Sequence, residues 1–247
     1  MKIVVPLKQV PDLVEELEVD DSGTQLDFEV LKLKLNEFDD HALEEALLLK
    51  EGDSAEVIVV AADDEDADRI LFTALAKGAD RAVKLTGVDA NADNHTLSQA
   101  FASAAQGLGA DLVLVGVQSP GDRDGQLAPM MAAHMDVPSV SVVTGVQPSG
   151  QMVTVHKEYS GGMMAEFEVD LPAVLGIQAA RQAPRYAPVS KVRQVQQSAS
   201  LESLDAQAGG ANTGKVLKLE PPPKGQGAKM LSSAEDILEI LKEKGVV

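Results

Sequence analysis

The 247-residue sequence contains no cysteine, no tryptophan and only 3% aromatic residues. Without cysteine, the chain can form neither disulfides nor thiolate metal sites. Because 45% of the residues are nevertheless hydrophobic, the core must be built from Val, Leu, Ile, Ala and Met, as is typical where parallel strands meet helices. No apolar run approaches the roughly 18 residues of a membrane span. The first residues already resemble a strand, so we expect no signal peptide and a cytoplasmic protein that is not membrane-embedded.

Positive charge is also scarce. The chain has 21 Lys and Arg against 39 Asp and Glu, which gives a formal net charge of −18. An acidic surface repels the phosphates of nucleic acids, so we expect no nucleic-acid partner. A solvated acidic surface is the simplest reason for this charge, and a salt-rich cytoplasm or a basic docking partner is the alternative.

Strand-like and helix-like segments alternate over most of the chain. Short apolar, β-branched runs predict strands, and amphipathic segments predict helices. The expected strands are 2–7, 56–62, 82–85, 111–117, 140–146 and 171–177, and the expected helices are 40–50, 65–77, 95–108 and 126–135. Gly78 and Gly109 stand at two helix ends, where glycine accommodates a left-handed conformation. This alternation predicts an α/β fold: an open, mostly parallel, doubly wound (Rossmann-like) sheet with helices on both faces.

Two segments interrupt this alternation. Residues 17–28 and 152–169 alternate apolar and polar positions around turns, which predicts antiparallel hairpins added to the sheet edge.

The composition changes after Gln178. Residues rich in Gln, Ser, Ala and Gly follow, then a stiff triple proline and a short amphipathic helix that Ser232 and Glu235 would begin with a capping box. We therefore divide the chain into a nucleotide-binding α/β domain, 1–178, and an extended partner-docking arm with a terminal helix, 179–247. One amphipathic helix cannot fold alone, so it must dock on this domain or on a partner.

The loop that begins at Gly116 is the best candidate for a binding site. It follows a buried strand and leads into a helix, and open α/β sheets bind ligands at the carboxyl ends of strands over helix N-termini. Its glycines let backbone amides approach a phosphate, and Gln118, Arg123 and Gln126 add side-chain donors. A merely flexible surface loop would have the same composition.

Other functional signatures are missing. The sequence has neither a P-loop nor a complete G-x-G-x-x-G fingerprint, and its four histidines are scattered without metal-ligand spacing. No Ser/His/Asp arrangement stands out. We expect no catalytic residue and no metal site.

Several segments form one pattern along the chain: 3–12 (IVVPLKQVPD), 35–39 (LNEFD), 42–47 (ALEEAL), 73–80 (TALAKGAD), the loop from Gly116, 171–174 (LPAV) and 184–186 (PRY). Together they resemble the electron transfer flavoprotein β-subunit family, nearly from end to end. The resemblance implies a heterodimer with a larger α subunit that carries FAD, partly sheltered by the β subunit. Such a chain would relay electrons between flavin dehydrogenases and a quinone or other acceptor, as a carrier subunit and not a stand-alone catalyst.

The resemblance also implies a second adenine nucleotide in this chain, either AMP or, as in electron-bifurcating relatives, a second FAD. Residues 90–98 (ANADNHTLS) loosely resemble the flavin-contacting segment of those relatives, with Asp93 and Thr96 as polar groups. The sequence does not decide between AMP and FAD. The cofactor-binding residues that the resemblance assigns are Pro6, Asn36, Phe38, Ala62, Gly116, Val117, Gln118, Ser119, Pro120, Gly121, Asp122, Arg123, Asp124, Gly125, Gln126 and Leu127.

Three further positions concern partners. Phe38 and Leu13 would lie near the flavin of the α subunit, and Val189 would lie on the loop where dehydrogenases and an acceptor oxidoreductase dock. The sequence departs from the family at Leu127, where Thr is common, and at 191–197, which is poorer in lysine. A stand-alone adenine-nucleotide-binding regulatory module is the alternative, but such a module would not need the long tail.

Overall fold

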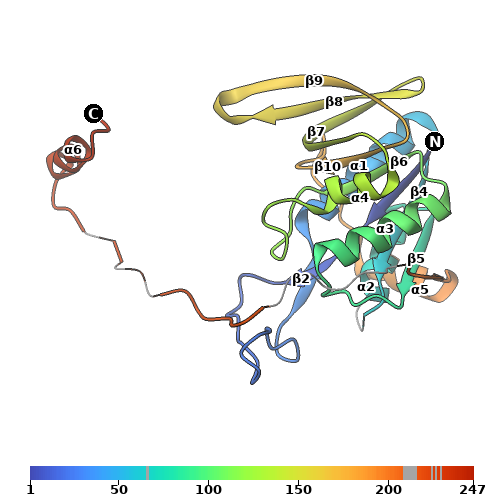
Figure 1. The fold of residues 1–247 in the computed structure, drawn as a ribbon, viewed down its shortest axis with the longest axis horizontal. Coiled ribbons are helices and arrows are strands. Elements are labelled where there is room, and N and C mark those ends of the chain that lie inside the picture. Colours follow the sequence, from blue (N-terminus) through green and yellow to red (C-terminus); the bar gives the residue numbers. More distant parts are fainter. Residues whose placement is uncertain (65–66, 208–215, 224, 226, 229) are drawn as a thin grey trace. The chain divides into compact units, whose positions relative to one another are not determined.

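The computed structural model describes residues 1–247 except 65–66, 208–215, 224, 226 and 229 (Figure 1). The described residues divide into two compact units. Unit 1 comprises Met1–Glu18 and Asp27–Lys215, and unit 2 comprises Val19–Leu26 and Val216–Val247. Part of the helix predicted at 65–77 and part of the tail therefore lie outside the described residues.

Unit 1 is built on one large sheet, whose strand order in the described residues is β11-β5-β4-β1-β6-β10-β7-β8-β9. The strands are β1 (Lys2–Pro6), β4 (Glu56–Ala62), β5 (Arg81–Thr86), β6 (Leu112–Gly116), β7 (Ser139–Ser149), β8 (Met152–Tyr159), β9 (Met163–Asp170), β10 (Ala173–Ile177) and β11 (Glu202–Asp205). Pairing is parallel from β11 to β7, and β7, β8 and β9 pair antiparallel. The predicted mostly parallel sheet with a hairpin at 152–169 on its edge is confirmed.

Helices cover both faces of this sheet (Figure 1). They are α1 (Glu37–Asp53), α2 (Ala67–Lys77), α3 (Asn94–Leu108), α4 (Leu127–Met135) and α5 (Val189–Ser198), with a 3₁₀ turn, η1 (Ser160–Gly162), between β8 and β9. Alternate residues of a strand point to opposite faces: Ile3 and Val5 of β1 pack with α1 and α2, whereas Val4 packs with α3 and α4. The doubly wound arrangement is therefore confirmed.

Two helices end at the glycines that the sequence analysis predicted. Gly109 ends α3 with φ 69°, and Gly78 follows α2 with φ 129°. At the other end of α3, the Asp93 carboxylate accepts a hydrogen bond of 2.9 Å from the Thr96 amide. A side-chain oxygen in this position satisfies a free N–H of the first helical turn.

The segment 17–28 differs from its prediction. In place of a hairpin at the sheet edge, it has a single antiparallel bridge between Val19 and Leu26, which belongs to unit 2. Local bonds explain the difference, since the Asp20 carboxylate accepts from the amide (3.0 Å) and hydroxyl (2.6 Å) of Ser22, which favours a turn over strands. Antiparallel strands form instead from residues before and after this segment, where β2 (Gln9–Pro11) pairs with β3 (Leu33–Leu35).

The polar region after Gln178 contains more structure than its composition indicated. Helix α5 packs on α2, and β11 adds a parallel strand beside β5. Both belong to unit 1.

Unit 2 contains the terminal helix, α6 (Ala234–Glu243). Its capping box lies one residue later than predicted, between Ser233 and Asp236. Ile237 and Leu238 on this helix keep 48% and 51% of their surface exposed. In the same unit, the amide of Leu219 donates to the carbonyl of Gly23 at 2.8 Å.

Gly116 lies where the first turn of α1 approaches the end of β6. A Cβ atom at this position would lie 2.6 Å from the Asp39 amide nitrogen and 2.7 Å from the Phe38 carbonyl carbon. The Asp39 carboxylate lies closer still, and the other two neighbours are backbone atoms, so a larger side chain would displace α1 from the sheet.

We expect Gly116→Ala to lower the free energy of unfolding by roughly 2–3 kcal/mol, because the added methyl overpacks this contact. Gly107→Ala is the matched control: it lies in α3, with nothing within 4 Å of its added Cβ, and should raise stability by about 0.5 kcal/mol or more through helix propensity. Urea unfolding of both variants measures the difference. Equal stability of the two would contradict the close approach.

Candidate functional site

The carboxyl ends of β4, β1 and β6 lie side by side in the sheet. The chain passes from β1 through α1 to β4 on one side, while β6 lies on the other side of β1 and is reached through α3 on the opposite face. Strand order therefore reverses at β1, and open α/β sheets bind ligands in the crevice at such a point.

A buried carboxylate joins the loops at this edge. Asp39, in the first turn of α1, has a fully buried side chain and accepts from the Lys8 amide (2.8 Å), the Lys8 ammonium (3.0 Å) and the Asn36 side-chain amide (2.9 Å). The same Asn36 nitrogen donates to the Gln118 carbonyl at 2.8 Å. The loops after β1 and β6 are thus fixed to the start of α1.

A second carboxylate orders the loop after β6. Asp122 is buried and accepts from the amides of Gln126 (2.9 Å) and Leu127 (3.0 Å) at the start of α4. The Asn94 side chain, at the start of α3, donates to it at 2.8 Å. The Asp122 carboxylate thus occupies the amides that would be available to a phosphate at this helix end.

The rest of the loop closes on itself. Ser119 and Asp122 exchange backbone hydrogen bonds of 3.2 and 3.0 Å, and the Gln118 side chain donates to the Arg123 carbonyl at 2.7 Å. Gly125 has φ 66°, and a Cβ there would lie 2.6 Å from the Val117 carbonyl oxygen. These contacts favour an ordered site over a merely flexible loop.

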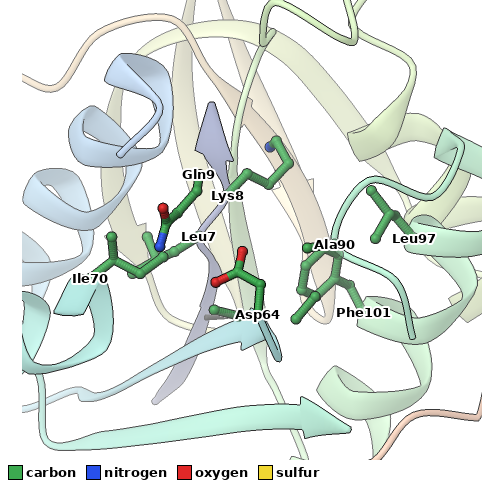
Figure 2. Close-up of a pocket in the computed structure, with 10 residues that line it drawn as sticks. Leu7, Lys8, Gln9, Asp64, Ile70, Ala90, Leu97 and Phe101 are labelled. Carbon is green, nitrogen blue, oxygen red and sulfur yellow. The ribbon is translucent and has the colours of Figure 1, made fainter. Parts of the chain in front are cut away.

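A hollow opens beside β1 and β4 at the same edge (Figure 2). It holds about 260 Å³ of space between protein atoms, part of it open to solvent. Its lining includes Leu7, Gln9, Ala62, Ile70, Leu97 and Phe101. The side-chain nitrogen and oxygen of Gln9 are buried and have no hydrogen-bond partner in the described part of the chain.

The structure places the predicted site residues on one edge. Pro6 ends β1, Ala62 ends β4 and lines the hollow, and Asn36 contacts the loop 116–127. Leu127 is a buried core residue, packed with α3, so its apolar side chain is explained by packing. Whether these residues bind a nucleotide stays a prediction.

Sequence reasoning missed Lys8, Gln9, Asp39 and Asn94. Lys8 and Gln9 carried a usable signal, since they are polar residues directly after a buried strand, where the same switch-point rule applies. Asp39 and Asn94 carried none, because their partners lie far away in the sequence.

Two carboxylates on α1 hold the segment that follows β10. Glu45 accepts from the Val146 amide (2.9 Å) and from the amide (3.0 Å) and Nε (2.8 Å) of Arg181. Glu44 accepts from the amide (2.9 Å), Nε (3.0 Å) and Nη2 (2.8 Å) of Arg185. These bonds fix the path that leads to Val189, whose side chain is exposed.

The ion pair changes the titration of both partners. Burial alone would raise the pKa of Glu44, but the hydrogen bonds and charge of Arg185 outweigh it and hold the pKa below its ordinary value. Hydrogen bonds to Glu44 and Glu51 raise the pKa of Arg185.

A lowered pKa in the folded state means that ionised Glu44 stabilises the fold above the pKa of the unfolded chain, and that this stability is lost as pH falls through the folded-state pKa. We expect Glu44→Gln to be less stable by roughly 2 kcal/mol at pH 7 and to lose less stability than the parent between pH 5 and 3. Glu168→Gln, at an exposed position of β9, is the control. Urea unfolding against pH checks this, and parallel curves for parent and Glu44→Gln would contradict it.

Neither a metal site nor a membrane span is found in the part of the chain that the structure describes. No three His, Asp or Glu side chains gather there as metal ligands, and none of the helices there is both long and apolar enough to cross a bilayer.

Comparison with known proteins identifies the family. Residues 26–223 match the model of the electron transfer flavoprotein domain. The chain is 32% identical to the electron transfer flavoprotein subunit beta of Methylophilus methylotrophus, over 98% of each chain. It is 34% identical to that of Syntrophomonas wolfei, over 95% of this chain and 92% of the relative. A rice relative, named as mitochondrial, is 29% identical over the full length of both. This chain belongs to the electron transfer flavoprotein β-subunit family.

Proposed function

We propose that this chain pairs with an FAD-carrying α subunit, and that it binds an adenine nucleotide at the carboxyl ends of β1, β4 and β6. The observation that carries the nucleotide site is the hollow at the carboxyl ends of β1 and β4, beside the loop after β1 that Asp39 holds through Lys8. Apolar walls there suit a flat base, and the polar loop 118–126 suits a phosphate.

We take AMP over a second FAD as the nucleotide of this site. Asp93, which the resemblance linked to a second flavin, has a structural role as the cap of α3, so its presence gives no separate reason for a flavin. A second FAD in this chain, with electron bifurcation, is the alternative.

Exposed apolar residues supply the surface for the α subunit and its flavin. FAD bound in the partner accepts and passes on electrons. Leu13 is exposed and Phe38 is half-buried at the start of α1, and we propose that both exclude water from that flavin. Met163 and Met164, at the start of β9, are exposed as well.

We further propose that residues 1–178 bind the nucleotide and that 179–247 act as a partner-docking arm. Val189 would contact dehydrogenases and an acceptor oxidoreductase, and the apolar side of α6 would contact a protein partner. The heterodimer would relay electrons from flavin dehydrogenases to a quinone or other acceptor. The location stays a prediction: we expect the cytoplasm, although the rice relative is named as mitochondrial.

Nucleotide stoichiometry tests this proposal. The chain is co-expressed with its α subunit, the purified complex is denatured, and FAD and AMP are quantified by chromatography. We expect one FAD and one AMP per heterodimer. Two FAD and no AMP would support the alternative, electron bifurcation with a second FAD in this chain. A chain that purifies alone without any nucleotide would refute the proposal.

Substitutions in α6 test the proposed partner-docking arm. We expect Ile237→Asp combined with Leu238→Asp to weaken assembly or partner docking by roughly 10-fold or more, because charges replace the apolar side of the helix. Glu239→Ala combined with Glu243→Ala changes charged residues of the same helix and serves as control. Pull-down with the α subunit and steady-state electron transfer are the measurements. Unchanged values for the Asp variant would remove α6 from the docking arm.

A further inference from the structure

Gln9 has a buried side-chain amide that lacks a partner within the described residues. Neither its Nε2 donor nor its Oε1 acceptor forms a hydrogen bond with these residues. Buried polar groups in proteins nearly always have a hydrogen-bond partner, and leaving one unpaired costs free energy. A group of this kind at a ligand site indicates that the ligand supplies the partner.

The surroundings of Gln9 are mostly apolar, although the carboxylate of Asp64 also lines the hollow. Figure 2 shows its side chain in the lining of the hollow together with Leu7 and Ile70. Leu97 and Phe101 contribute further apolar lining. The neighbouring ammonium of Lys8 is bonded to Asp39, so its charge is already paired.

A glutamine amide presents one donor beside one acceptor. The N6 amino group of adenine donates and its N7 nitrogen accepts, so glutamine binds this edge with two hydrogen bonds, accepting from N6 through Oε1 and donating to N7 through Nε2. A 6-oxopurine presents two acceptors at the same edge, O6 and N7, so it would leave the Oε1 atom of Gln9 unpaired. The amide therefore selects for a 6-aminopurine.

We propose that Gln9 is the residue of this chain that reads the N6/N7 edge of the bound adenine and sets the base specificity of the site. This inference rests on the proposed nucleotide site and adds to it a specific residue and contact. The Pro6 and Ala62 positions could read a base only through their backbone, whereas Gln9 supplies a side chain.

The test uses the heterodimer with FAD in its α subunit, freed of the nucleotide of this chain. Calorimetric titration compares AMP, IMP and 7-deaza-AMP, which lacks N7. We expect the parent to bind AMP about 10- to 100-fold more tightly than IMP, and 7-deaza-AMP with an intermediate affinity. Gln9→Leu should lose this discrimination and bind AMP roughly 10-fold or more weakly. Gln151→Leu, an exposed glutamine in the turn between β7 and β8, should behave as the parent.

A second readout does not depend on the nucleotide. Because Gln9→Leu removes an unpaired buried amide, its nucleotide-free complex should melt at a higher temperature than the parent. Gln9→Glu keeps an acceptor for N6 but loses the donor for N7, so it should bind AMP and 7-deaza-AMP with similar affinity.

The outcomes separate the two proposals. If the parent binds AMP without discrimination against IMP, or if Gln9→Leu binds AMP as tightly as the parent, the inference on Gln9 is wrong and the nucleotide site stands. If the parent binds none of the three nucleotides, both are wrong.

Discussion

The buried carboxylate of Asp39 is the constraint on which the candidate site depends. It accepts hydrogen bonds from Lys8 and Asn36, and through Asn36 it reaches the loop after β6. A fully buried carboxylate is stable only when it is paired and hydrogen-bonded. The loops must therefore take these positions for Asp39 to be buried, and Gly116 lets α1 come close enough for them to do so.

Helix α1 connects this edge with the segment that leads to Val189. Its first turn carries Asp39, and one turn later Glu44 and Glu45 hold Arg185 and Arg181. One rigid helix thus sets both the crevice and the path of the chain after β10. A site built on a regular element keeps its geometry better than one built on loops alone, which suits the proposed nucleotide site and docking segment.

The acidic, aromatic-poor composition is consistent with this architecture. The parallel strands are covered on both faces mostly by aliphatic side chains from α1 to α4, with Phe101 as the aromatic exception, so little aromatic volume is needed in the core. The larger apolar side chains that stay exposed, among them Tyr186, Met163 and Leu238, lie outside that core. Exposed apolar surface of this kind is typical of protein interaction sites.

Local patterns in the sequence determined the βα alternation, the glycines that end α2 and α3, and the position of the loop after Gly116. Each is a property of neighbouring residues, and periodicity reports which of them are buried. Only the tertiary structure decided that Asp39 accepts from Lys8, Asp122 from Asn94 and Glu45 from Arg181, because these bonds join residues that are far apart in the chain. It also decided β11, whose four residues are all exposed and which pairs with β5 through its backbone and through an ion pair of Glu202 with Arg81 (2.7 Å). An edge strand without buried side chains leaves no hydrophobic pattern, so its pairing becomes visible only when the neighbouring strand is in place.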